Sequence, residues 1–308
     1  MTHTHSHATE QPSYGQAFAL GISLNLFFVL IEAFYGWHAN SLALLADAAH
    51  NLSDVAGLLL AWVAYGVAKL RPNVRHTYGW RKASILASFA NAVFLLIAMG
   101  SLATEAISRF GEPGELNAET VMVVAGVGVI INAITAWLFM RGSRSDLNIR
   151  GAFLHMAADA FVSLVVVVSG AFALWLGWTQ LDPVVSLVIA IVIVIATLSL
   201  FKQSLHMLFD GVPDSVDLNA IQNALLETPG VRALHDLHVW NLSTTETALT
   251  AHLTLEQVCQ SDEILADVIH LLAVEFHIEH VTIQCESTQF TQDCQLNRLD
   301  SSHLKYVH

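Results

Sequence analysis

Long apolar stretches dominate the first two thirds of the chain. Each is long enough for the roughly 20 helical residues that cross a bilayer core. The six stretches lie at about residues 16–37, 41–68, 84–108, 119–140, 150–177 and 183–208. Only Ala39, Asn40 and Ser41 separate the first two, which suits a tight turn between antiparallel helices. The pattern predicts a bundle of six transmembrane helices.

Shorter patterns follow after about residue 210. Residues 214–231 and 261–276 repeat apolar positions at helical period, and Ser261 is a candidate N-cap for the second helix. Residues 234–243, 248–256 and 280–287 alternate apolar and polar positions as half-buried strands do. The order αββαβ predicts a three-stranded sheet with helices packed on one face.

These patterns divide the chain into four parts, and composition supports the division. We expect a histidine-containing tail at 1–15, a membrane domain at 16–210, an α+β domain at 211–290 and a C-terminal tail at 291–308. Apolar residues make up 54% of the chain and charged residues 13%, so membrane lipid is the expected surrounding of the first domain. The net charge of −13 argues against a nucleic-acid partner, because phosphates require basic patches.

The basic residues indicate how the helices are oriented. Eight lie in the loops after the second and fourth apolar stretches or at their edges, whereas the alternate loops contribute almost only Arg109. The eight are Lys69, Arg71, Arg75, Arg81, Lys82, Arg141, Arg144 and Arg150. By the positive-inside rule these loops are cytoplasmic, which predicts a multi-pass inner-membrane protein with both termini in the cytoplasm.

The termini and the cysteines fit that location. The N-terminus has neither the basic n-region nor the cleavage site of a secretory signal, so we expect it to be retained as a tail. Cys259, Cys285 and Cys294 are an odd set confined to the C-terminal third, which favours a reducing compartment over a disulfide framework.

Two apolar stretches carry the same polar motif. In "DAAHNLSD" of the second stretch, His50 and Asp54 have i, i+4 spacing, which places them on one helix face. The fifth stretch repeats the spacing in "HMAAD", with His155 and Asp159. Facing one another, the two helices would form a site of two imidazoles and two carboxylates.

The ligand types in this motif favour particular metals. Tetrahedral Zn²⁺ accepts histidine and carboxylate ligands, whereas Mg²⁺ and Ca²⁺ prefer larger all-oxygen shells. Copper(I) would favour cysteine or methionine, and the apolar stretches contain no cysteine. The motif therefore favours zinc, cadmium or cobalt.

A buried histidine–aspartate pair can also be a satisfied contact between helices. Two matched pairs favour the metal interpretation, because ionisable groups within a membrane are costly and mark functional sites. Asp47 shares the face of His50 and either orients an imidazole or contributes to helix packing. Glu32 and the intramembrane asparagines are interpreted as interhelical hydrogen-bonding groups.

Four segments resemble the cation diffusion facilitator family: "SLALLADAAHNLSD", "RHTYGW", "NIRGAFLHMAAD" and "HVTIQCES". The resemblance covers nearly the whole chain. It implies a homodimeric metal/proton antiporter with six transmembrane helices and a metallochaperone-like αββαβ cytoplasmic domain. The transport ligands would be His50, Asp54, His155 and Asp159. Within the family, retention of both histidines indicates a zinc exporter, with cadmium, cobalt and nickel as further cargoes.

The resemblance also implies two further metal sites. His76 matches a loop position that binds metal at the membrane–cytoplasm interface in relatives, although a lone loop histidine is often only solvated. In the cytoplasmic domain, His235, His252 and Glu286 match ligands at the dimer interface, where zinc would act as a regulatory ligand. Gln284 stands where some relatives have histidine, which disfavours a full binuclear cluster.

Both tails contain further candidate ligands. Cys294 resembles a cysteine of a tail that caps the soluble site in relatives. His3, His5 and His7 alternate in the N-terminal tail, where they would gather metal or simply be solvated.

The ligand chemistry predicts exchange, because histidine binds metal when neutral and a carboxylate binds when ionised, so metal and protons compete. The sequence therefore predicts a secondary transporter and not an enzyme. The alternatives are a membrane sensor or scaffold with a structural metal site, and a metallohydrolase, for which the chain lacks an HExxH or nucleophile motif.

Overall fold

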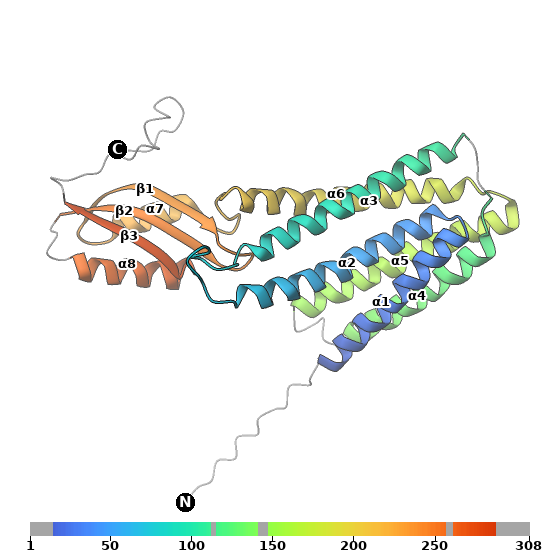
Figure 1. Ribbon diagram of the computed structural model, residues 1–308, viewed down its shortest axis with the longest axis horizontal. Helices are drawn as coiled ribbons and strands as arrows, with labels where there is room; N and C mark the ends of the chain where they lie inside the picture. The colour runs from blue at the N-terminus through green and yellow to red at the C-terminus, as the bar shows by residue number, and fades with distance from the viewer. Residues whose placement is uncertain (1–14, 112–114, 141–146, 257–260, 288–308) are drawn as a thin grey trace, which may run out of the picture. The chain divides into compact units, whose positions relative to one another are not determined.

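The computed structural model describes residues 15–111, 115–140, 147–256 and 261–287 (Figure 1). The chain forms two compact units. One comprises Met1–Leu59 and Asn91–Leu198, and the other comprises Leu60–Ala90 and Ser199–His308. Three long helices have residues in both units.

Six long helices precede the first strand, as predicted. They are α1 (Gly15–His38), α2 (Leu42–Ala68), α3 (Ala83–Arg109), α4 (Ala118–Met140), α5 (Leu147–Leu176) and α6 (Leu181–Leu208). For these six helices, no predicted end differs from the observed end by more than three residues. Within the described residues, α2 to α6 each contain a segment long and apolar enough to cross a membrane. α1 is 24 residues long.

The turn between α1 and α2 is set by two polar residues. Asn40 adopts a left-handed conformation with φ of 57°, which asparagine tolerates better than most residues. Ser41 then caps α2, because its Oγ accepts a hydrogen bond from the amide of Leu44 at 3.2 Å. The chain therefore reverses direction within three residues.

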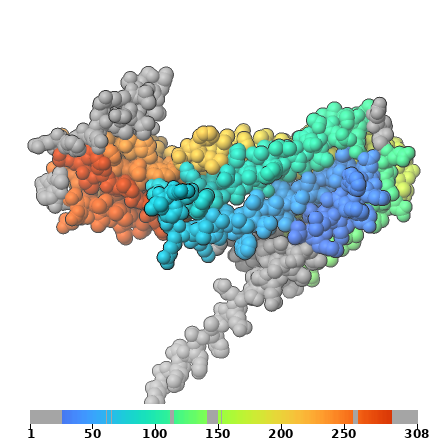
Figure 2. All heavy atoms as spheres, in the orientation of Figure 1, coloured from blue at the N-terminus to red at the C-terminus, as the bar shows by residue number. Residues whose placement is uncertain are grey.

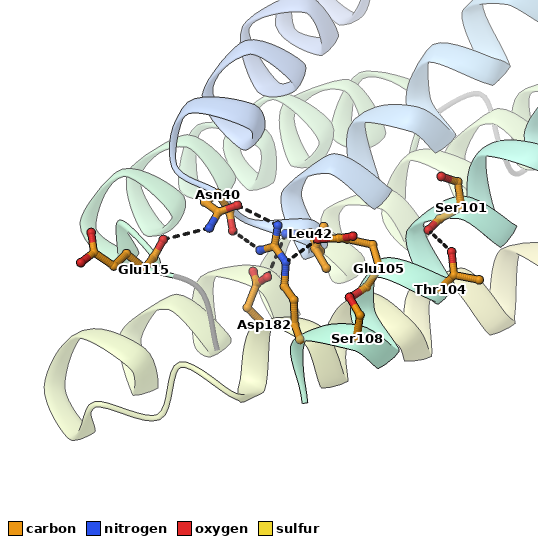
Figure 3. A network of polar contacts seen from close by, with 9 residues as sticks. Asn40, Leu42, Ser101, Thr104, Glu105, Ser108, Glu115 and Asp182 are labelled. Carbon is orange, nitrogen blue, oxygen red and sulfur yellow. Dashed lines mark hydrogen bonds and ion pairs between the residues drawn. The ribbon is translucent and has the colours of Figure 1, made fainter. Parts of the chain in front are cut away.

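A polar network holds this turn to two other helices (Figure 3). Arg109, at the end of α3, donates to the backbone carbonyl of Asn40 at 2.6 Å and to its side-chain oxygen at 2.7 Å. Asp182, in the first turn of α6, accepts from the amide of Leu42 at 2.8 Å and from the Ser41 hydroxyl. The start of α2, eight residues before His50, is thereby fixed.

Small residues let the helices of the first unit approach closely. A Cβ added at Gly128 of α4 would lie 2.8 Å from the ring of Phe28 on α1. A Cβ at Gly170 of α5 would lie 3.3 Å from the backbone nitrogen of Met122 on α4. Close helix contact of this kind is typical of membrane bundles. In the space-filling view, the atoms of α1 and α2 lie against one another on the face shown (Figure 2).

The predicted αββαβ order is confirmed in the C-terminal part. Its elements are α7 (Leu218–Glu227), β1 (Val231–Asn241), β2 (Thr247–Leu255), α8 (Ser261–Glu275) and β3 (His280–Ser287). The sheet order is β1-β2-β3, with β1 antiparallel and β3 parallel to β2.

Both helices of this domain pack on one face of the sheet. Leu225 of α7 and Leu272 of α8 join Leu249 and Leu253 of β2 in one buried cluster. Strand residues point alternately to opposite faces, so the even-numbered residues of β2 face away from these helices. The second face of the sheet is therefore available for other side chains.

We expect Asp217→Ala to destabilise the C-terminal α+β domain by about 1 kcal/mol, the usual contribution of a helix N-cap. The Asp217 carboxylate accepts from the amides of Asn219 at 2.9 Å and Ala220 at 3.2 Å, which caps α7. Urea unfolding of a 211–308 fragment would measure the change. Asp214→Ala, which removes an exposed carboxylate outside the cap, is the matched control. Equal stability of the two variants would contradict the assignment.

Candidate metal sites

The helices α2 and α5 bring the two HxxxD motifs together. His50 and Asp54 come from α2, and His155 and Asp159 come from α5. The His155 Nε2 lies 3.1 Å from Asp54 Oδ2 and 3.6 Å from Asp159 Oδ2. The His50 Nε2 lies 3.7 Å from both Asp54 Oδ2 and Asp159 Oδ1. Each imidazole therefore faces both carboxylates, as the sequence predicted.

The nitrogen–oxygen separations are close to those expected between ligands of a tetrahedral zinc ion. Ligand atoms about 2.0–2.1 Å from a tetrahedral Zn²⁺ lie about 3.3 Å from one another. The four nitrogen–oxygen distances, 3.1 to 3.7 Å, bracket that value. Asp54, His155 and Asp159 form one of the clusters of metal-ligating groups found among the described residues, with their ligand atoms within 4.8 Å of one another. His50 is not part of that cluster, so it would move towards the other three groups to complete a four-ligand shell.

Two buried oxygens of the quartet make no hydrogen bond within the described residues. They are Asp54 Oδ2, which lies near both histidines, and Asp159 Oδ2, which lies near His155. A buried carboxylate oxygen without a donor is costly, so it favours a cation or a proton beside it. The side chain of Asp159 is 3% exposed, whereas that of His155 is 43% exposed. The quartet is therefore open on one side.

Asp47 and Glu32 stand behind the quartet. Asp47 accepts a hydrogen bond from the Ser163 hydroxyl of α5 at 2.8 Å, so it ties together the two helices that carry the motifs. Glu32 of α1 accepts from the amide of Asn51 at 3.4 Å, which ties α1 to α2. From the sequence, Glu32 was interpreted as a group that forms hydrogen bonds between helices. In the structure it does so with Asn51 of the neighbouring helix.

A second cluster lies on the sheet face opposite α7 and α8. His235 of β1, His252 of β2 and Glu286 of β3 place their ligand atoms within 4.8 Å of one another. Glu286 Oε2 lies 3.4 Å from His235 Nε2, and Glu286 Oε1 lies 3.2 Å from His252 Nδ1. Gln284 donates its amide to Glu286 Oε1 at 2.8 Å. Three strands thus bring together the three residues expected at this site.

One residue beside this cluster, Asp236, was not assigned a role from sequence. The pairing of β1 with β2 shifts register between His235 and His238, and Asp236 there has φ of 53°. Its carboxylate lies 2.9 Å from His238 Nε2 and 3.6 Å from His252 Nε2. A bulge breaks the two-residue alternation of a strand, so the pattern could not predict where Asp236 points.

The remaining candidates lie apart from both clusters or outside the described residues. His76 stacks on Trp80, with ring centroids 4.2 Å apart, and belongs to neither of the clusters of metal-ligating groups found in the described residues. Cys285 packs against the helix-covered face of the sheet, as strand alternation predicted. Burial raises the pKa of its thiol, and the nearby Asp262 charge adds to the effect, so the ligand form is disfavoured. Cys294 and the N-terminal histidines lie outside the described residues.

Family comparison agrees with this arrangement of two domains. Residues 18–209 match the cation efflux transmembrane domain, and residues 213–288 match the cytoplasmic domain of cation efflux proteins. The chain belongs to the cation efflux family, the cation diffusion facilitators. The family resemblance stated from the sequence is confirmed, and membership places the chain among membrane transporters.

Several curated relatives resemble the chain over most of its length. It is 34% identical to the zinc transporter ZitB of Escherichia coli, with 100% of both chains covered. It is 32% identical to a cadmium, cobalt and zinc/H(+)-K(+) antiporter of Bacillus subtilis, over 86% of this chain and 87% of that protein. CzcD of Cupriavidus metallidurans is 33% identical, over 92% and 89% of the two chains.

Among solved structures, the metal-bound C-terminal domain of CzcD is 42% identical over 23% of this chain and 99% of that chain, with a TM-score of 0.22.

We expect His235→Ala combined with Glu286→Ala to abolish zinc-dependent stabilisation of a 211–308 fragment. Zinc at 100 times its Kd stabilises a folded domain by about 2.7 kcal/mol, because only the folded state gathers the ligands. Thermal unfolding with and without zinc measures the effect. His270→Ala, which removes an exposed histidine of α8, should keep the full stabilisation. An equal stabilisation by zinc in the double variant would show that this cluster does not bind the zinc.

Proposed function

We propose that the chain exports Zn²⁺ from the cytoplasm across the inner membrane in exchange for protons. The observation that carries the proposal is the quartet of His50, Asp54, His155 and Asp159. Its nitrogen–oxygen distances are 3.1 to 3.7 Å, and its residues come from two helices long enough to span a membrane. The names of the zinc-transporting relatives support the same cargo.

Proton exchange follows from what the ligands do when zinc leaves. A histidine that binds zinc through a ring nitrogen binds a proton through the same nitrogen, and an aspartate oxygen does likewise. Protons that reach the quartet therefore displace the ion, and zinc that reaches it displaces protons. The antiporter name of the Bacillus relative supports this coupling. Cadmium, cobalt and nickel have compatible ligand preferences and are further cargoes.

The open side of the quartet favours transport over a permanent structural site. Structural zinc sites close around their ion, usually with cysteine ligands. Here His155 is partly exposed, and the described parts of α1 to α6 contain no cysteine. An ion in such a site can exchange when the helices move. The quartet therefore favours a transporter over a sensor or scaffold with fixed metal.

The cytoplasmic cluster is assigned a regulatory role. Its three ligands leave one tetrahedral position open, which a ligand from a second copy of the chain or a water molecule would fill. A match to the cytoplasmic domain of cation efflux proteins supports a homodimer. Zinc bound there would tighten the dimer and bias the membrane domain through coupling free energy. With both termini in the cytoplasm, this domain would sense the metal that is to be exported.

We expect His155→Ala and Asp159→Ala each to reduce zinc flux to that of empty vesicles. Each substitution removes one of four ligands and leaves a shell that cannot close around Zn²⁺. Zinc uptake and internal pH would be recorded in vesicles with an imposed pH gradient. His38→Ala, which removes an exposed histidine outside both clusters, should transport normally. Wild-type flux in either ligand variant would refute the proposed site.

We expect His50→Asp to retain transport but to shift selectivity towards harder ions such as Mn²⁺. The substitution changes two nitrogens and two oxygens into one nitrogen and three oxygens, and carboxylate is the harder ligand. Competition between zinc, cadmium and manganese in the same vesicles measures the shift. An unchanged order of preference would show that His50 is not a ligand.

A further inference from the structure

Two carboxylic acids that the proposed exchange at the quartet does not use lie together behind it. Glu32 of α1 and Asp47 of α2 are both 0% exposed. Asp47 lies one helical turn before Asn51 on α2, and the Asn51 side chain donates to Glu32 Oε2 at 3.4 Å, so the two carboxyl groups are neighbours. Two ionised carboxylates in contact, away from water, would repel each other and lose their hydration. The pair therefore requires some form of neutralisation.

The hydrogen bonds around the pair show where that neutralisation is missing. Asn51 donates to Glu32 Oε2 at 3.4 Å, and Ser163 donates to Asp47 Oδ2 at 2.8 Å. The other oxygen of each acid, Glu32 Oε1 and Asp47 Oδ1, is buried and has no donor among the described residues. An ionised carboxylate is only an acceptor, so a hydrogen bond between two of them needs a proton on one.

No basic side chain of the neighbouring helices supplies the missing charge. α1, α2 and α4 contain no lysine or arginine, and Arg150 of α5 lies in its first turn, 13 residues before Ser163. The charged groups that act on the pair are Asp159 and His50 of the quartet. On α4, which packs against α1, the only titratable side chain is Glu119, exposed in the first turn.

We infer that Glu32 and Asp47 share one proton while the quartet is empty and release it when a divalent cation binds there. This rests on the proposed function only in that the quartet must bind the cation. A double positive charge at the quartet stabilises the doubly ionised pair, because Coulomb interactions are strong in a medium of low dielectric constant. By reciprocity, return of the proton to the pair weakens cation binding.

The pair would give the exchanger a proton site outside the metal ligands. Protons on the ligands themselves compete with zinc for the same atoms, so they exclude it directly. A proton on Glu32 or Asp47 leaves all four ligand atoms free and acts through charge alone. Zinc affinity would then depend on pH more steeply than the four ligands alone dictate.

The test is the pH dependence of zinc binding to the full-length protein in detergent. The slope of log Kd against pH counts the protons released with each zinc ion. Zinc binding to each protein is measured with and without an added His155→Ala substitution, which disables the quartet. The difference between the two measurements is the binding to the quartet, because binding to the cytoplasmic cluster is common to both. Glu32→Gln and Asp47→Asn are each expected to lower the slope by about one.

The double variant distinguishes a shared proton from two separate ones. Because a single proton serves both acids, Glu32→Gln with Asp47→Asn should also lower the slope by about one, no more than either single change. A decrease of two would overturn the sharing of one proton. An unchanged slope in both single variants would overturn the inference. Glu119→Gln, which removes the exposed carboxylate of α4, should leave the slope as in wild type.

Infrared difference spectra of the wild type provide a readout that needs no variant. Zinc addition should remove the carbonyl band of a protonated carboxylic acid, and no such loss would contradict the inference. If wild type and His155→Ala bind zinc alike at every pH, the quartet is not a cation site. The proposed function and this inference then both fail, whereas an unchanged slope with an intact quartet removes only the inference.

Discussion

The membrane half of this chain is organised by the cost of placing polar groups in an apolar interior. A buried carboxylate without partners is unstable by several kcal/mol, so each one fixes the position of a partner on another helix. The Asp47 carboxylate accepts a hydrogen bond from Ser163, and that contact holds α2 beside α5. The Glu32 carboxylate accepts a hydrogen bond from the side chain of Asn51, and that contact holds α1 beside α2. The ligand-bearing helices are therefore held together by the groups behind the site.

The same constraint acts at the turn between α1 and α2. The first backbone amides of α2 lack partners within the helix, and the Asp182 carboxylate and the Ser41 hydroxyl accept from Leu42 and Leu44. Arg109 satisfies the carbonyl of Asn40. A helix whose start is fixed in this way has a fixed rotation, and rotation decides whether His50 and Asp54 face α5 or the lipid. Polar contacts remote from the quartet thus contribute to its geometry.

Sequence predicted what depends on spacing along the chain, and structure was needed for what depends on contact between distant segments. Apolar stretches of transmembrane length gave the helix ends, and i, i+4 spacing identified the quartet. The approach of Glu32 to Asp47 depends on how α1 lies on α2, which no periodicity encodes. The contact of Asp182 with Ser41 joins residues 141 positions apart. Asp236 was missed because it lies at a strand irregularity, where alternation does not apply.

The two clusters of candidate metal ligands differ in what each needs in order to form, and this difference bears on their proposed roles. The quartet takes all four ligands from two helices of one chain, so a change in the relative position of α2 and α5 can open or close it. The cytoplasmic cluster takes one ligand from each of three hydrogen-bonded strands, whose spacing the sheet fixes. A rigid, incomplete shell suits binding that depends on an additional ligand. Four candidate ligands on two separable helices suit binding followed by release, which is what exchange across a membrane requires.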